Sequence, residues 1–329
     1  MGFTFQGHPF SESFTPPWWL KNPHLQTLWA SLCSPGTDAE YQRQHLELAD
    51  GDFLELDWSP NPGNNGPIVL ILHGLEGSSH SNYVRRLVLN LYPQGFQCMV
   101  MHFRGCGGST NRLQRTYHSG ETGDLDLIIR WLRQAYPDRP IAVIGYSLGA
   151  NVLLKWLGEQ RDQAPIQAAV AICPPLRLEV CARRLERGLS RVYQLLLLKS
   201  LINKVLRKYR HRTSPLDLNR VAEARTFYEF DDAVTAPLHG FASADEYYRQ
   251  SSSRPYLKTI RKPCLIISSF DDPFMTPEVL PSTDELGPRS QLEITRYGGH
   301  VGFVAARGLF AIRFWLEQRI ILYLNSVLS

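Results

Sequence analysis

Apolar and polar residues alternate along HLELADGDFLELDW (residues 45–58), on both sides of an Asp-Gly pair. Such a pair between alternating runs predicts a β-hairpin, because Asp-Gly readily adopts the tight turn that joins antiparallel strands. Farther along, apolar residues form short continuous runs separated mostly by helical patterns, at residues 67–73, 96–103, 140–145, 166–173 and 263–270. Runs of this kind are typical of buried parallel strands with crossover helices.

Residues 174–255 break this order, because no strand pattern occurs there and Lys and Arg accumulate. We interpret this segment as a helical cap inserted into the sheet domain. A last alternating run at 291–297 predicts a strand, and the amphipathic tail at 308–326 predicts a closing helix. The sequence thus predicts an aromatic, proline-rich arm packed on the core, a divided α/β core, and the cap, at residues 1–44, 45–173 with 256–329, and 174–255.

The composition fits this organisation. With 43% hydrophobic and 20% charged residues, the 329-residue chain can bury a large core. A net charge of +4 is too small to indicate nucleic acid as a partner. The six cysteines include no CxxC pair, so neither a zinc site nor a disulfide framework is expected. The first ten residues lack the regions of a signal peptide, and no apolar run reaches the ~20 residues of a membrane-spanning helix. These features indicate a cytoplasmic protein.

Chemistry-bearing residues follow the predicted strands. In an open parallel sheet, functional groups collect where the carboxyl ends of the strands meet, at one edge of the sheet. The five segments that follow strands here are HGLEG at 73–77, RGCGGS at 104–109, GYSLG at 145–149, DDP at 271–273 and GGH at 298–300. The sequence therefore places serines, acids and histidines at one edge.

Ser147 stands between two glycines in GYSLG, directly after a predicted strand and before a helical pattern. One interpretation is a strand-to-helix turn with an incidental serine, since this short motif also occurs by chance. The other is a nucleophile elbow, in which glycines permit a strained turn that exposes the serine hydroxyl above the sheet. An acid and a histidine follow in the chain order expected of a catalytic triad, so we favour the nucleophile.

His300 is the candidate base, because a serine hydroxyl attacks a carbonyl only when a neighbouring group accepts its proton. The flanking glycines at 298, 299 and 302 allow a sharp loop that aims the imidazole at the serine. The acid that orients this histidine is Asp271 or Asp272. The expected oxyanion donors are the backbone N–H groups of Leu75 and Leu148.

Other polar residues give weaker evidence of a functional site. His73 is expected to be a structural neighbour of the site, and Cys106 lies near it with nothing in sequence to mark a nucleophile. His118, with Glu121 and Asp124, suggests a metal or an acyltransferase pair, but a helix start capped by Ser119 or Thr122 is the favoured interpretation. The chain has no HExxH, Walker or GxGxxG motif, so no metal and no cofactor is expected.

Seven segments together resemble a known family: PPWWLKNPHLQT, HGLEGSSHSNY, FRGCGGS, YHSGETGDL, GYSLGAN, SSFDDPFM and GGHVGF. From about residue 10 to 310 the chain is similar to the YheT-like branch of the α/β-hydrolase superfamily, which is related to yeast medium-chain ethyl ester synthases and animal hydrolase-domain phospholipases. The resemblance implies an α/β-hydrolase fold, with a mostly parallel eight-stranded sheet, flanking helices and a helical cap. It also implies a charge relay of Ser147, Asp272 and His300, with Asp272 as the acid.

The sequence is compatible with three functions. The first is a serine esterase that hydrolyses short- to medium-chain or lipid-like carboxylic esters through an acyl-enzyme. The second is an acyltransferase, in which an alcohol takes the place of water and every named residue is shared. The third is a non-catalytic lipid-binding scaffold, which an intact triad argues against.

Net positive charge is concentrated in one span of the cap. Between residues 177 and 225 there are 13 Lys and Arg against four acids, a net charge of +9. Within it, an apolar stripe is expected to pack over the site, and basic residues are expected to meet either anionic lipid at the inner face of the membrane or an anionic acyl substrate such as a phospholipid or acyl thioester. The predicted stripe is Leu195, Leu198, Ile202, Val205 and Leu206; the basic residues are Lys199, Lys204, Arg207, Lys208 and Arg210.

Overall fold

The computed structural model describes residues 4–5, 8–9, 11, 14–32, 38–63 and 65–328. Cys33 lies outside the described residues, and so do most of the first ten residues, where the sequence analysis expects no signal peptide. Within it, no helix combines the length and apolar character needed to cross a membrane.

An eight-stranded sheet forms the centre of the molecule, in the order β10-β9-β8-β7-β5-β6-β4-β3. The strands are β3 (Gln42–Glu47), β4 (Phe53–Trp58), β5 (Ile68–Leu72), β6 (Gln97–Met101), β7 (Ile141–Tyr146), β8 (Ala168–Ile172), β9 (Cys264–Ser269) and β10 (Ser290–Thr295). Strands β5 to β10 are mutually parallel, whereas β3 and β4 pair as the antiparallel hairpin that joins the sheet at β6. The predicted mostly parallel sheet is confirmed.

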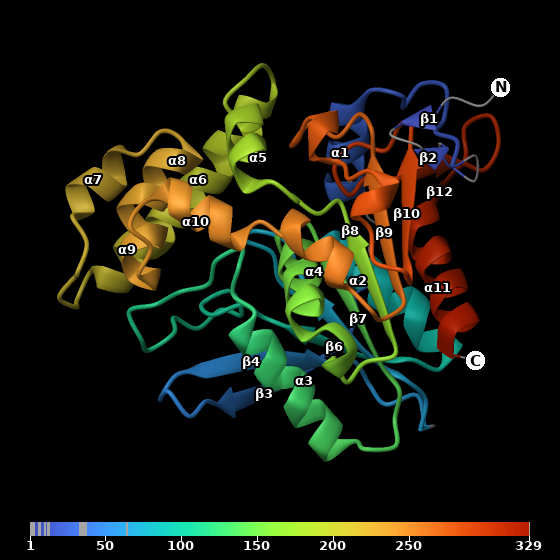
Figure 1. The fold of residues 1–329 in the computed structure, drawn as a ribbon, viewed down its shortest axis with the longest axis horizontal. Helices are drawn as coiled ribbons and strands as arrows, with labels where there is room; N and C mark the ends of the chain where they lie inside the picture. The colour runs from blue at the N-terminus through green and yellow to red at the C-terminus, as the bar shows by residue number, and fades with distance from the viewer. Residues whose placement is uncertain are drawn as a thin grey trace.

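Helices cover both faces of this sheet (Figure 1). The helices of the core are α1 (Pro23–Leu32), α2 (Asn82–Leu91), α3 (Gly123–Ala135), α4 (Leu148–Gln160) and α11 (Trp315–Leu328). Helices α3 and α4 pack together, while α1, α2 and α11 form a second group. The inner strands β5, β7 and β8 are buried at every position, which is why their sequences read as continuous apolar runs.

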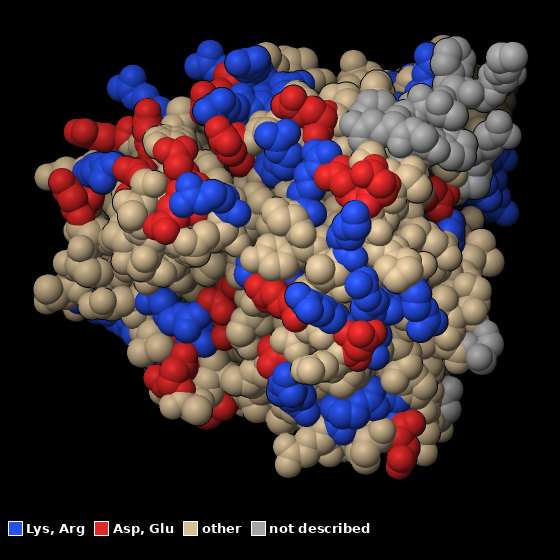
Figure 2. All heavy atoms as spheres, viewed as in Figure 1, with Lys and Arg blue, Asp and Glu red and all other residues tan. Residues whose placement is uncertain are grey.

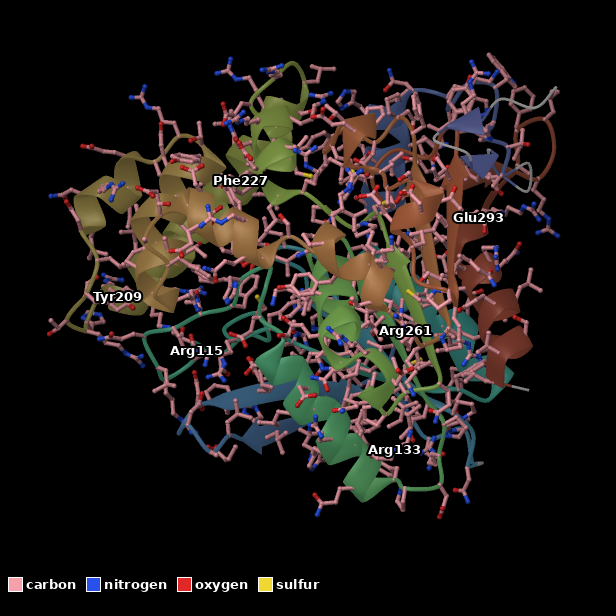
Figure 3. All side chains as sticks on the ribbon, viewed as in Figure 1. Arg115, Arg133, Tyr209, Phe227, Arg261 and Glu293 are labelled. Atoms are coloured by element: carbon pink, nitrogen blue, oxygen red, sulfur yellow. The ribbon has the colours of Figure 1, made fainter. Side chains whose placement is uncertain are left out.

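Between β8 and β9 the chain forms only helices and turns, as the cap prediction requires. They are α5 (Leu178–Leu185), α6 (Ser190–Tyr209), α7 (Leu218–Glu223), α8 (Phe227–Phe230), the π-helical turn η3 (Asp231–Thr235), α9 (Ala236–His239), α10 (Ala244–Ser251) and the turn η4 (Arg254–Thr259). The cap has its own apolar cluster, which Leu75 and Phe274 join from the core. Figure 3 places Tyr209 and Phe227 in this layer, away from Arg133 and Glu293 of the core.

The C-terminal prediction was partly wrong. The helix begins at residue 315, and the preceding residues form an antiparallel pair, β11 (Val304–Ala306) with β12 (Ile312–Phe314). The physical reason is tertiary: Ile312 and Phe314 pack against the cluster around Leu20 of the N-terminal arm. The remaining short elements are β1 (Thr4–Phe5), β2 (His8–Pro9), η1 (Tyr92–Gln94), η2 (Arg161–Gln163), η5 (Pro277–Val279) and η6 (Thr283–Glu285).

Candidate active site

Ser147 sits at the sharp turn from β7 into α4. Its φ of +50° is a strained value for a residue with a side chain. The flanking glycines make this turn possible, because a Cβ on Gly145 would lie 2.5 Å from the Gly149 carbonyl oxygen, and one on Gly149 would lie 2.6 Å from that of His73. The turn therefore admits no larger residue at either position and presents the serine at the edge of the sheet.

Three side chains from separate loops meet in one hydrogen-bonded chain. The Ser147 hydroxyl donates to Nε2 of His300 over 2.9 Å. Nδ1 of His300 donates to Oδ2 of Asp272 over 2.7 Å. Asp272 and His300 are almost fully buried, so the bonds are shielded from competing water. This arrangement lets the imidazole accept the serine proton while the carboxylate fixes its tautomer.

The neighbouring aspartates have different partners. Asp272 also accepts a hydrogen bond from the Phe274 N–H, at 2.8 Å. Asp271 instead accepts from the N–H of Gly299 at 3.0 Å, and burial raises its pKa to about 6. Asp271 therefore orders the loop that carries the histidine, and the structure gives it no contact with the imidazole itself.

His300 has two further supports that sequence reasoning missed. Its backbone N–H donates to the hydroxyl of Thr27 in α1, at 2.9 Å. The ring of Phe274 stacks on the imidazole, with centroids 4.1 Å apart and planes 6° apart. A side chain on Gly299, which has φ +58°, would approach the Pro23 carbonyl oxygen to 2.4 Å. The N-terminal arm thus forms one wall of the histidine loop.

Leu75 and Leu148 both line the cavity that contains Ser147. Leu148 is the first residue of α4, where a backbone N–H has no partner inside the helix. His73 lies behind them: burial lowers its pKa to about 3, Nδ1 donates to the Gly74 carbonyl, and Nε2 accepts from the Phe103 N–H. His73 is therefore a neutral structural residue, as expected.

Glu76, next to Leu75, ties this loop to the cap. It has φ +55°, and its carboxylate accepts from the Tyr117 and Ser200 hydroxyls, each at 2.7 Å. Lys204 of α6 forms an ion pair with the same carboxylate and donates to Sγ of Cys106 at 3.3 Å. Burial raises the pKa of the Cys106 thiol to about 11, so this thiol is a contact rather than a nucleophile.

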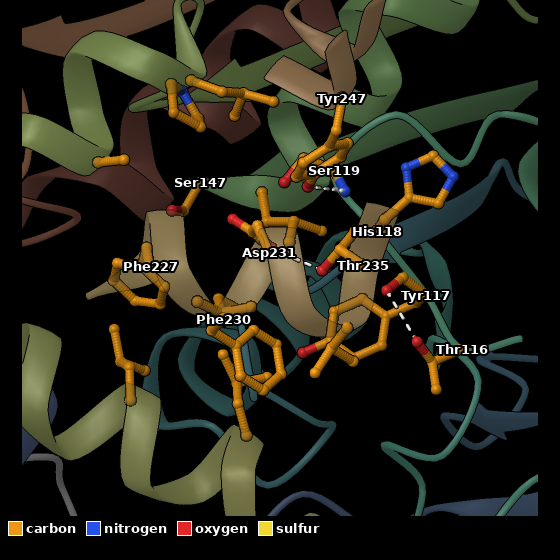
Figure 4. A pocket seen from close by; sticks show the side chains of 18 of the residues that line it. Thr116, Tyr117, His118, Ser119, Ser147, Phe227, Phe230, Asp231, Thr235 and Tyr247 are labelled. Atoms are coloured by element: carbon orange, nitrogen blue, oxygen red, sulfur yellow. Dashed lines mark hydrogen bonds between the residues drawn. The ribbon is translucent and has the colours of Figure 1, made fainter. Parts of the chain in front are cut away.

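A cavity of about 160 Å³ adjoins Ser147 and His300. The loops of the core form one side and the cap the other (Figure 4). Most of its wall is apolar, with cap residues that include Leu178, Leu185, Leu201, Val205, Phe227 and Phe230. The arrangement suits a substrate with an apolar chain.

The orientation predicted for α6 was wrong in part. Leu195 is 57% exposed, whereas Leu201, Lys208 and Tyr209 are buried with Leu198 and Val205. Lys208 is 6% exposed and donates to Asn111 Oδ1 and to the Gln114 and Arg115 carbonyls. Burial lowers its pKa to about 8. Lys204 and Lys208 therefore face inward and are unavailable to an external surface.

His118 lies beside Glu121 and His239. The N–H of Gly120 donates to Nδ1 of His118 at 3.1 Å, so in the neutral ring the proton is on Nε2, which faces Glu121 as a donor rather than a metal ligand. The predicted cap was wrong in detail, because Thr122 precedes α3 without a side-chain bond. Glu121 accepts from the Gly123 N–H instead.

Comparisons with known proteins concern the family and the fold. A family model described as the alpha/beta hydrolase fold matches residues 67–305. YheT of Escherichia coli (strain K12), provisionally named an esterase, is 42% identical over 99% of this chain and 97% of its own. The human phospholipase ABHD3 is 29% identical over 89% of this chain and 74% of its own. A medium-chain fatty acid ethyl ester synthase/esterase of Saccharomyces cerevisiae (strain ATCC 204508 / S288c) is 32% identical over 72% and 58%.

Among solved structures, the Pyrococcus furiosus esterase Pf2001 superposes with a TM-score of 0.58 at 21% identity, covering 88% of this chain and 92% of its own. At this identity the likeness concerns the fold.

Proposed function

The chain belongs to the α/β-hydrolase fold family and is a carboxylic ester hydrolase, and from that premise we propose that Ser147, His300 and Asp272 are its catalytic triad. The observation that carries the proposal is the pair of hydrogen bonds, 2.9 and 2.7 Å long, that connects the three side chains in order. The complete set also argues against a non-catalytic lipid-binding scaffold, which has no need of an aligned base and acid.

In the first half of the reaction, Ser147 Oγ attacks the ester carbonyl and its proton passes to Nε2 of His300. Asp272 stabilises the imidazolium that forms. The N–H groups of Leu75 and Leu148 are the proposed donors to the tetrahedral oxyanion. When the intermediate collapses, the carbon–oxygen bond to the alcohol breaks, and the imidazolium gives its proton to the departing alkoxide.

In the second half, His300 takes a proton from water as the water oxygen attacks the acyl-enzyme. The bond to Ser147 Oγ breaks, the serine recovers its proton from the imidazolium, and a carboxylic acid is released. None of these steps requires a cofactor. The overall reaction is hydrolysis of an ester to an acid and an alcohol.

The proposed substrate is an ester with a short- to medium-length acyl chain or a lipid-like structure. The apolar lining beside Ser147 supports this class, because each buried methylene contributes about 0.8 kcal/mol. Medium-chain esters should therefore be turned over better than acetyl esters. A kcat/KM that falls from acetate to octanoate would reject the apolar chain site.

Acyl transfer to an alcohol is the second candidate. It is favoured by the similarity to the yeast protein named a synthase and esterase. An alcohol in place of water uses the same residues, so the two reactions are separated by the products formed when an alcohol is added.

Peripheral contact with an anionic membrane is also part of the proposal, on a different surface from the one predicted. Helices α1 and α6 meet through His24 and Tyr193, whose rings stack 5.7 Å apart. Both helices, with the turn before α6, expose apolar side chains, namely Leu25, Leu28, Leu189, Val192, Leu195 and Leu196. The same turn and α6 also expose the cations Arg187, Arg191 and Lys199. We call this the α1–α6 surface. Figure 2 shows further Lys and Arg over the neighbouring α5.

A fluorophosphonate tests the triad directly, since it labels an activated serine without needing the right substrate. The wild-type protein should be labelled, and peptide mapping should locate the label on Ser147. Ser147→Ala should abolish both labelling and hydrolysis of a nitrophenyl hexanoate. Labelling that persists in the alanine variant would identify another nucleophile, and an unlabelled wild type would favour the binding scaffold.

A further inference from the structure

The cavity wall contains one carboxylate that the triad does not use. Asp231 begins the π-helical turn η3, and its side chain lines the same cavity as Ser147. Figure 4 shows it between Ser119 and Phe230, with Ser147 on one side and Thr235 on the other. Single π-helical turns are rare and are frequently found at functional sites.

No described cation neutralises Asp231. Its two oxygens accept hydrogen bonds from the hydroxyls of Thr235, at 2.6 Å, and Tyr248, at 2.7 Å. Within the described ranges, no lysine, arginine or histidine forms an ion pair with it. The titratable groups that face it are the phenols of Tyr247 and Tyr248, whose pKa values are raised by burial.

The cations elsewhere in the cavity wall already have partners. Lys204 is paired with Glu76, Lys208 donates to three neutral oxygens, and Arg104 is paired with Asp52 and Asp124. Asp231 thus remains an uncompensated acid in a largely apolar chamber. Burial raises its pKa to about 6, so it is mainly ionised at pH 7.5 and has no cationic partner of its own.

Aromatic rings lie around this carboxylate. Phe227, Phe230, Tyr247 and Tyr248 all line the cavity, and the two tyrosine rings lie 5.3 Å apart. Aromatic faces attract cations, and a carboxylate among them adds a direct charge interaction. The combination is suited to an ammonium group more than to a neutral chain.

We propose that Asp231 and its aromatic neighbours form a subsite for a cationic group on the substrate, separated from the ester by an apolar segment. The inference rests on the proposed function, because it assigns this cavity to the substrate of Ser147. It adds the chemical class: an ester that carries an ammonium group.

Three nitrophenyl esters of equal chain length test the subsite at pH 7.5: hexanoate, 6-hydroxyhexanoate and 6-ammoniohexanoate. Asp231→Asn should lower kcat/KM for the ammonium ester at least about tenfold, the usual scale of a hydrogen bond to a charged group. It should leave the neutral hexanoate within about twofold. Asp232→Asn is the matched control, because it removes an acid that pairs with Arg220 and does not line the cavity.

A second measurement needs only the wild-type protein and does not depend on which part of the ester carries the charge. Hexylammonium should inhibit hydrolysis of nitrophenyl hexanoate at least about tenfold more strongly than hexanol. Equal inhibition, or an equal loss for the hydroxy and ammonium esters in Asp231→Asn, would overturn the cationic subsite. These results differ from failure of the triad, in which the wild type would not hydrolyse the neutral ester through Ser147.

Discussion

At the residue scale, His300 is held by four residues from three separate places in the chain. Ser147 and Asp272 bind its two ring nitrogens, Phe274 stacks on its face, and Thr27 accepts its backbone N–H. The first three contacts restrict the rotation of the imidazole ring, and the fourth fixes the backbone that carries it. The imidazole is therefore held ready for proton transfer before any substrate arrives.

The two aspartates make a sharp comparison at this scale. Asp272→Asn should reduce kcat on the order of 10⁴-fold, because an amide that donates toward Nδ1 favours the wrong tautomer. Asp271→Asn should cost far less, since Asp271 binds the backbone of Gly299 whereas Asp272 binds the imidazole. The measurement is kcat on nitrophenyl hexanoate for both purified variants.

Circular dichroism of both variants serves as the control for folding. If Asp271→Asn lost more activity than Asp272→Asn, the acid of the triad would have to be reassigned.

At the element scale, helix α6 connects the cap to the loop that carries Leu75. Ser200 and Lys204 both bind Glu76, while the other end of the helix meets α1 through Tyr193. Burying Lys204 is costly unless its charge is paired. The ion pair with Glu76 therefore fixes the position of the loop relative to α6.

We therefore expect Lys204→Met to lower kcat about tenfold with a smaller change in KM, because a slight displacement of an oxyanion donor weakens transition-state binding. Lys199→Met is the control, since Lys199 is exposed on the same helix. Steady-state kinetics on nitrophenyl hexanoate distinguish the two. Equal kcat values for wild type and Lys204→Met would show that the cap does not order the loop.

At the scale of the whole molecule, the N-terminal arm, the cap and the sheet meet above the histidine loop. A series of rings runs from His24 through Tyr193 and Phe274 to His300, with successive centroids 5.7, 4.9 and 4.1 Å apart. The α1–α6 surface is thus connected to the site by direct ring contacts. A lipid surface bound there would lie next to the site proposed for lipid-like esters.

Vesicle co-sedimentation tests this surface. The protein should bind anionic vesicles, with binding weakened by salt, and should not bind zwitterionic ones, since each Lys or Arg near an anionic membrane contributes about 1 kcal/mol. Replacing Leu195 and Leu196 with glutamine should reduce binding. Leu322→Gln is the matched control, because Leu322 is equally exposed, at 66%, on α11. Binding that ignores lipid charge would remove the membrane from the proposal.

The sequence by itself determined the succession of the core strands along the chain and the turn that carries Ser147. Apolar runs reveal buried strands because every side chain in them is covered, and the glycines on either side of Ser147 indicate a tight turn because they stand between a strand pattern and a helical pattern. These are local signals, so no knowledge of distant contacts was needed. The placement of His300 after the last strand of the eight-stranded sheet followed from chain order alone.

Tertiary structure decided what depends on distant partners. Asp271 and Asp272 are adjacent in the chain, and where the family resemblance favours Asp272, the structure adds that the imidazole lies against Asp272 and the Gly299 N–H against Asp271. Thr27 reaches a residue 273 positions away, a separation that no local pattern encodes. In α6 the leucines are spread around the helix, so the sequence does not show which face is apolar. Packing against neighbouring elements determines which side chains of α6 are buried. The inward Lys208 follows from that packing, because burial is a property of the assembled layers.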